Sequence, residues 1–73
     1  MNDLYDIIEK VIGKRPEPED SFIDDLGADS LEMLDLLMLV EERFKIKVST
    51  EEAAAIVSVH DLEALISEKE PAT

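Results

Sequence analysis

The sequence contains no cysteine and no tryptophan, and its aromatic residues are one tyrosine and two phenylalanines. Without cysteine the chain can form neither a disulfide nor a thiolate metal site, and a single histidine leaves few ligands for zinc. We therefore expect no metal centre. With so few aromatics, the core must consist mainly of Leu, Ile, Val and Met, which is typical of a helix bundle. Any thiol chemistry would have to come from an added group.

Basic residues are also scarce: seven Lys and Arg stand against 19 Asp and Glu, which gives a net charge of -12. Such a charge repels phosphate backbones and anionic membranes, so we expect no nucleic-acid partner. It favours encounter with proteins that present Lys and Arg, although solubility alone would also explain it.

Long apolar runs are absent as well. No apolar run is longer than that of Leu36 to Val40, which is far too short to span a membrane, and no basic segment opens the chain. We expect no membrane insertion and a cytoplasmic location.

The length predicts one domain over residues 1–73, with little room for a deep catalytic cleft. Apolar spacing predicts helices over about 3–12, 30–44, 50–56 and 59–69. The predicted fold class is all-α, with three main helices, one short helix and a long first loop. The first two helices should be antiparallel, and the second and fourth parallel.

Residues 3–12 carry one apolar stripe, and Gly13 is a natural helix end. Two prolines then predict an extended loop. At its far end three apolar residues should anchor the loop to the core: Phe22, Ile23 and Leu26.

The helix over 30–44 has the clearest pattern. Asp29 or Ser30 should cap its start, with Glu32 in the first turn, where a carboxylate complements the helix dipole. Its inward face should comprise Leu31, Leu34, Leu37, Val40 and Phe44.

The alternating residues 45–48 are too short and too isolated to predict a strand, so we interpret them as an extended connection. Ser49 and Glu52 form a capping-box pattern before the short helix. Ser58 should cap the last helix, whose inward face should comprise Val59, Leu62, Leu65 and Ile66.

The segment before the second helix suggests a chemical role. Gly27 allows a sharp bend, and Ser30 follows at the first turn, where the helix dipole tolerates a phosphate. Ser30 is therefore a candidate phosphate-ester site. The local pattern alone favours a serine that only caps the helix.

The segment Ser21-Phe22-Ile23-Asp24-Asp25-Leu26-Gly27-Ala28-Asp29-Ser30-Leu31 closely resembles the modification site of acyl carrier proteins. The resemblance continues to about Ile66, and residues 7–13 look like the family's first helix. It implies an acyl-carrier-like bundle and a carrier that is not an enzyme.

The resemblance also implies that a phosphopantetheinyl transferase (holo-carrier synthase) moves 4'-phosphopantetheine from coenzyme A onto Ser30. Asp29 matches an acidic residue that helps to bind the transferase's magnesium. Acyl groups would travel as thioesters on the arm, in fatty-acid synthesis or in a specialised acyl, lipid or polyketide pathway.

Partners of this family, which include acyl-transferring, condensing and ligase enzymes, dock basic patches on the acidic second helix. The matching positions here are Glu32, Asp35, Met38, Glu41 and Glu42. A merely solvated helix face is the alternative. The protein should be a monomer.

As in the family, an acyl chain could enter between the second and third helices. The residues that could separate to admit it are Leu34, Met38, Ala53, Ala55 and Ile56. Ordinary core packing explains each of them equally well.

Two departures from the family pattern, the short stretch between Gly13 and Phe22 and the pair Ala54-Ala55, favour a specialised carrier. A peptidyl or D-alanyl carrier and a helical interaction adaptor remain alternatives. A serine hydrolase is excluded, because the sequence has no G-x-S-x-G motif of the kind that presents the nucleophilic serine in such enzymes. A calcium loop would place Phe22 where a carboxylate is required.

Overall fold

The computed structural model describes residues 2–69, which form four helices: α1 (Asn2–Ile12), α2 (Ser30–Phe44), α3 (Thr50–Ala55) and α4 (Val59–Lys69). Within this range the only β pairing is an isolated antiparallel bridge between Ser21 and Ser58. The all-α prediction is confirmed. The predicted bounds differ by one residue at the start of α1 and at the end of α3.

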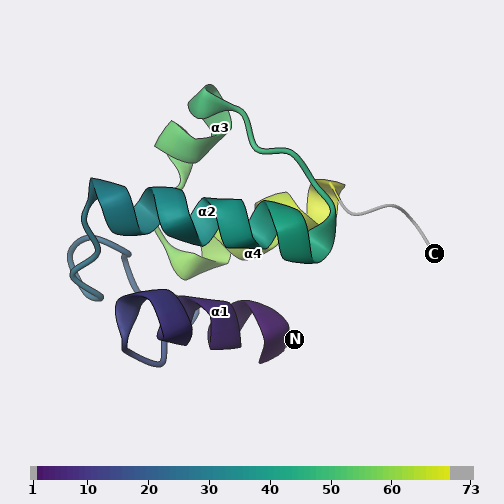
Figure 1. Cartoon of the computed structure of the whole chain (residues 1–73). Coiled ribbons are helices and arrows are strands. Elements are labelled where there is room, and N and C mark those ends of the chain that lie inside the picture. Colours follow the sequence, from purple (N-terminus) through teal and green to yellow (C-terminus); the bar gives the residue numbers. More distant parts are fainter. Residues whose placement is uncertain (1, 70–73) are drawn as a thin grey trace.

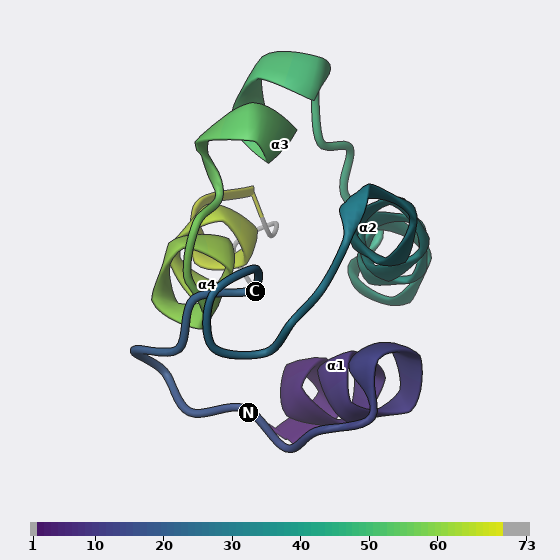
Figure 2. The same ribbon diagram turned by 90° about the vertical axis from the view of Figure 1, so that its left-hand side faces the viewer.

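The helices pack in the predicted directions. In Figure 1, α1 runs opposite to α2, while α4 runs in the same direction as α2. Figure 2, which looks along the helices, shows α1, α2 and α4 around a common centre. The short α3 lies across α2 and α4 on the side away from α1.

The core is built by the three long helices and by four residues of the connections, Phe22, Leu26, Ala28 and Ile46. Its largest fully buried side chains are Leu4, Ile8, Phe22, Leu36, Val40, Val59, Leu62 and Ile66. By contrast, α3 has no buried residue. The short helix is therefore attached at the edge of the core, through partly buried Ala53 and through Ile56, which follows it.

The predicted inward face of α2 is wrong in its first two turns. Leu31 and Leu34 are 72% and 59% exposed, and Leu36 is fully buried in their place. The buried stripe follows residues 33, 36, 37, 40 and 44, whereas residues 31, 34 and 38 form a second apolar stripe. Both stripes obey the spacing of three or four residues, so periodicity alone cannot tell which one meets the core.

The loop between α1 and α2 is fastened to the start of α4 by backbone hydrogen bonds. Phe22 N–H donates to Val57 O at 3.0 Å, Val59 N–H donates to Asp20 O at 3.0 Å, and His60 N–H donates to Pro18 O at 2.9 Å. These bonds join residues far apart in the chain. No local pattern in the sequence predicts them.

Two of the three predicted loop anchors are buried. Phe22 and Leu26 lie in the core, but Ile23 is 67% exposed, so that part of the prediction is wrong. The backbone explains the difference, because Asp25 and Leu26 donate to Ser21 O at 3.0 Å and close a helical turn. In such a turn, residues four apart share a side, and Ile23 points elsewhere.

Both predicted capping serines are confirmed. Ser49 and Glu52 form a complete capping box at α3, and Ser58 Oγ accepts from Asp61 N–H at 3.2 Å at the start of α4. Glu52 Oε1 also pairs with Lys69 Nζ at 3.0 Å, which connects α3 to the last turn of α4.

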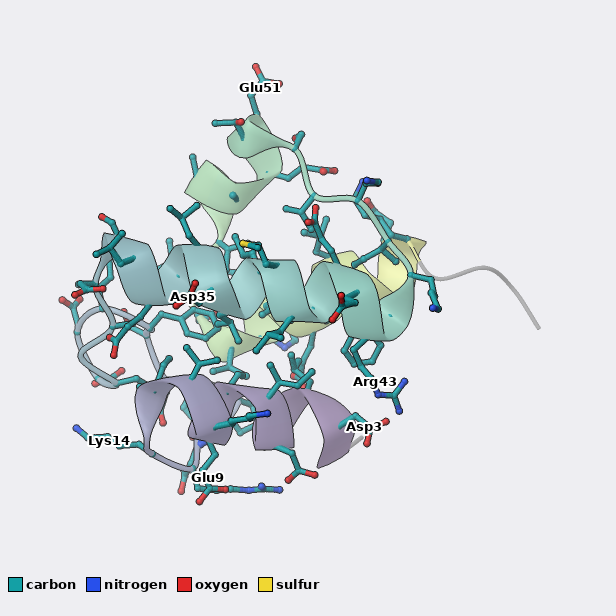
Figure 3. All side chains as sticks on the ribbon, viewed as in Figure 1. Asp3, Glu9, Lys14, Asp35, Arg43 and Glu51 are labelled. Carbon is teal, nitrogen blue, oxygen red and sulfur yellow. The ribbon has the colours of Figure 1, made fainter. Side chains whose placement is uncertain are left out.

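The far end of α2 is also tied in place. Arg43 pairs with Asp3 at the start of α1, and the two side chains face each other in Figure 3. The connection after α2 forms no strand, but its first residue, Lys45, is not extended as predicted: it caps α2 in the left-handed region, at φ 59° and ψ 46°, and Ile46 after it is buried. None of the helices within residues 2–69 has the length and apolar character needed to cross a membrane.

Candidate functional site

Ser30 is the first residue of α2 and is exposed. The residue before it, Asp29, is the N-cap, with extended backbone angles of φ -103° and ψ -177°. Asp29 Oδ1 accepts from Glu32 N–H at 2.8 Å, and Glu32 Oε1 accepts from Asp29 N–H at 3.2 Å. Of the two residues predicted to cap α2, Asp29 is therefore the N-cap. Ser30 is the first helical residue, and its hydroxyl does not cap the helix.

The turn that delivers Ser30 depends on Gly27, whose φ of +72° lies in the left-handed region. Next to it, Ala28 is 4% exposed and its N–H donates to Phe22 O at 2.8 Å. The buried alanine anchors the backbone immediately before the exposed Asp29 and Ser30. The site thus combines a fixed backbone with an accessible hydroxyl.

Several large apolar side chains are exposed on the elements near Ser30, and three of them, Ile23, Leu34 and Val57, line the same cavity as Ser30. The exposed side chains come from α2, from the first loop and from the connection before α4: Ile23, Leu31, Leu34, Met38 and Val57. Each is at least 59% exposed. So much exposed apolar area on a small domain is typical of a surface that contacts other molecules.

A cavity of about 620 Å³ opens beside Ser30, between α2, α3 and the first loop. Its lining includes Ser30 itself, together with Phe22 and Leu37, which the sequence predicted for the core, and Met33, which the sequence did not single out. Three of the five predicted acyl-pocket residues line it: Leu34, Ala53 and Ile56.

The other two do not. Met38 faces a separate hollow towards Lys45 and Lys47, and Ala55 faces one between α3 and α4. The lining therefore differs from the predicted set at Met38 and Ala55. Met38 lies on the same stripe as Leu34 but one turn further along α2, outside the cavity, and on α3 residues 53 and 54 line the cavity.

The four carboxylates predicted for docking on α2 fall into two classes. Glu32 belongs to the cap, and Glu41 Oε2 accepts from Val48 N–H at 2.7 Å in a half-buried position. Asp35 and Glu42 are exposed. Figure 3 shows Asp35 projecting from α2.

The residues at this site fit a phosphopantetheine ester. Ser30 offers an exposed oxygen at a helix N-terminus, where the dipole stabilises a phosphate. The apolar cavity beside it suits an uncharged chain. Among residues 2–69, no group of three or more His, Asp or Glu side chains is placed to hold a metal ion.

Comparison with known proteins agrees with this geometry. The family described as "Phosphopantetheine attachment site" matches residues 2–66. The acyl carrier protein of Bdellovibrio bacteriovorus is 40% identical over 69 residues, which cover 90% of this chain and 88% of that protein. The acyl carrier protein of Nitratidesulfovibrio vulgaris is 42% identical over 60 residues, covering 82% of this chain and 79% of that protein.

A solved structure of a candidate acyl carrier protein from Mycobacterium tuberculosis superposes with a TM-score of 0.85 at 25% identity, covering 89% of this chain and 90% of that one. Acyl carrier proteins are carriers and not enzymes, and their attachment domain bears a covalent 4'-phosphopantetheine. They interact with phosphopantetheinyl transferases and with acyl-processing enzymes. The chain belongs to the acyl carrier protein family.

Proposed function

We propose that Ser30 is the attachment residue and that the protein carries acyl groups on the arm bound there. The supporting observation is the exposed Ser30 hydroxyl, which starts α2 directly after the capping Asp29 and lines the apolar cavity. When bound, the arm supplies a thiol that holds acyl groups as thioesters, which the cysteine-free chain itself lacks.

In the loading step, Ser30 Oγ forms a bond to the pantetheine-side phosphorus of coenzyme A. The bond from that phosphorus to the bridging oxygen breaks, adenosine 3',5'-bisphosphate leaves, and the hydroxyl proton passes to a base of the transferase. This chain contributes the oxygen, its position at the helix start, and the neighbouring Asp29 carboxylate on the side of the transferase's magnesium.

Mass spectrometry tests the attachment directly. Incubation with coenzyme A, magnesium and a promiscuous phosphopantetheinyl transferase should add one arm to the protein, and Ser30→Ala should abolish the addition. Ser67→Ala, which removes an exposed serine from α4, is the matched control and should load normally. Loading of Ser30→Ala would show that another residue carries the arm.

The pathway we propose is fatty-acid synthesis or a specialised acyl, lipid or polyketide pathway, with acyl-transferring, condensing or ligase enzymes as partners. A peptidyl or D-alanyl carrier is the alternative cargo class. Identifying the thioester on protein isolated from its native source distinguishes these possibilities.

We also propose that partner enzymes dock on the exposed side of α2. Asp35 and Glu42 are free there to attract Lys and Arg, whereas Glu32 and Glu41 already bond to backbone N–H groups. Met38, which is 65% exposed, adds apolar contact area.

Charge reversal tests the docking surface. Asp35→Lys combined with Glu42→Lys should raise the KM of a transferase for this carrier several-fold and weaken its dependence on salt, because attraction to a basic patch is lost. A control with the same change in net charge is Glu63→Lys combined with Glu68→Lys on α4. Equal effects of both pairs would mean that net charge matters and the docking surface does not.

The cavity beside Ser30 is proposed to shelter the acyl chain. Ala53→Phe should fill part of it, so the thioester of a medium-chain acyl carrier should be cleaved faster by hydroxylamine. Ala55→Phe adds the same side chain on the same helix outside the cavity, and its thioester should be cleaved at the wild-type rate. Identical cleavage rates for the two variants would argue against this shelter.

A further inference from the structure

The cap of α2 joins Asp29 and Glu32 in both directions, and Ser30 lies between them in the chain. Glu32 Oε1 accepts from Asp29 N–H, and Asp29 Oδ1 accepts from Glu32 N–H. The first bond fixes the backbone of Asp29, and the second fixes its side chain. Together they determine how the Asp29–Ser30 peptide enters the helix.

The two oxygens of Asp29 have different roles in this arrangement. Oδ1 is held by the helix, while Oδ2 has no hydrogen-bond partner within residues 2–69. Because both oxygens belong to one rigid carboxylate, the bond at Oδ1 also sets where Oδ2 lies. One carboxylate, on the residue immediately before Ser30, therefore caps the helix with one oxygen and holds its second oxygen in a fixed place.

We infer that Glu32 is a positioning residue for loading of the arm. Glu32 acts by holding Asp29 in place, and Asp29 in turn fixes the position of the Ser30 hydroxyl. The negative charge of Glu32 does not itself contribute to recognition by a partner enzyme. This inference rests on the proposed attachment at Ser30. It separates Glu32 from Asp35, although both are acidic residues on the same helix.

The contacts of the other α2 carboxylates support the distinction. Glu41, near the opposite end of the helix, likewise uses its side chain on a backbone N–H, that of Val48. Asp35 and Glu42 are exposed, with no side-chain hydrogen bond within the described residues. Glu32 is half-buried and already bonded, so a docking partner gains less from it.

Positioning and docking affect different kinetic constants. During loading, Ser30 Oγ must reach the phosphorus in line with the departing adenosine 3',5'-bisphosphate while its proton leaves to the transferase's base. A loosened cap lowers the fraction of bound carriers in that geometry, which reduces kcat. Loss of a docking charge weakens encounter and raises KM instead.

The test compares Glu32→Ala with Glu32→Gln. Glutamine is a normal partner in a capping box, because its side-chain oxygen accepts the same N–H without a charge. Glu32→Ala should therefore lower kcat for loading by about fivefold, and Glu32→Gln should keep it within about twofold. Amide hydrogen exchange at Asp29 should accelerate in Glu32→Ala and stay near the wild-type rate in Glu32→Gln.

Controls keep the result interpretable. Glu68→Ala and Glu68→Gln on the exposed side of α4 should both load at the wild-type rate. Alanine favours helix, so Glu32→Ala should keep its helical spectrum, which circular dichroism checks. Asp35→Asn should raise KM with little change in kcat.

Equal losses of kcat in Glu32→Ala and Glu32→Gln would show that the transferase recognises the charge of Glu32 itself, and would overturn the inference. Wild-type kcat in both variants would overturn it too. The attachment proposal has its own test, because loading of Ser30→Ala would contradict it whatever the Glu32 variants do. Loss of loading in Ser30→Ala with unaffected Glu32→Ala would therefore reject the positioning role alone.

Discussion

Gly27 is the residue whose backbone conformation directs the first loop into α2. Its φ of +72° is costly for any residue with a Cβ, yet a Cβ placed there would meet no atom within 4 Å. Backbone strain alone therefore restricts this position. The same holds for Gly13, at φ +91°, which ends α1 far from the site.

This pair of glycines gives a residue-scale prediction. Gly27→Ala and Gly13→Ala should each destabilise the fold by about 1 kcal/mol, which corresponds to a fall in Tm of roughly 4–8 °C in thermal unfolding. Only Gly27→Ala should also slow loading at Ser30, because it disturbs the entry into α2. Slow loading in both variants would mean that lost stability, and not local geometry, limits the reaction.

Residues close together in sequence were predictable at this scale. Gly27, Asp29, Ser30 and Glu32 lie within one turn and a helix start, where capping rules apply directly. The bond from Val48 N–H to Glu41 was not predictable, because it depends on how the chain returns after α2. The sequence therefore suggested a docking role for Glu41, whereas the structure shows a contact that stabilises the connection.

At the scale of elements, the ends of α3 and α4 carry much of the local order around the cavity. Asp61 accepts from Val57 N–H and Ser58 N–H, each at 3.1 Å, and so holds the start of α4 and the connection from α3. These bonds, first that from Ser58 and then that from Val57, hold the pKa of Asp61 below its usual value of 3.8.

A lowered pKa has a definite consequence for stability against pH. The contribution of Asp61 is present above pH 3.8 and is lost as the pH falls through the lowered folded pKa. Asp61→Asn keeps an acceptor oxygen but does not titrate. Its Tm should lie below wild type at pH 7, and the difference should shrink as the pH falls below about 3.8.

The measurement is a series of thermal melts of both proteins from pH 7 to pH 3. The matched control is Glu68→Gln, which removes one exposed charge from the same helix and should follow the wild-type curve closely. A constant Tm difference for Asp61→Asn at every pH would contradict the assigned role of its charge.

The types and directions of the helices were more predictable than which side of each helix is buried. Capping residues and apolar periodicity located all four helices, and loop lengths indicated their relative directions. The sequence could not decide between the two apolar stripes of α2, because both satisfy helical spacing. That choice is made by α1 and α4, which cover the stripe through Leu36 and Val40 and leave Leu31 and Leu34 exposed.

At the scale of the whole molecule, charge is the dominant feature. A net charge of -12 sits on a domain with a radius of gyration of 11.2 Å, so mutual repulsion among carboxylates opposes the compact state. Ion pairs such as those of Arg15 with Asp6 and Glu9 relieve it only locally, because they are exposed.

Millimolar magnesium should therefore raise the Tm at low ionic strength, and sodium chloride should do so at higher concentrations, because screening and weak binding reduce the repulsion. Magnesium should add little once the salt concentration is high. Thermal melts across both titrations check this. A fall in Tm, or no change, would indicate that the carboxylates are spaced widely enough to tolerate one another.

The backbone bonds that fasten the first loop to the start of α4 also bear on the order of folding. The loop that presents Ser30 makes some backbone hydrogen bonds within itself, but three others join it to residues 57–60, so it cannot reach its final form before that later segment is available. On the ribosome, α1 and α2 can emerge and pair while the loop between them still lacks its anchor. Competence for loading should accordingly arise late in synthesis, after α4 has docked, which would protect an unfinished chain from premature modification.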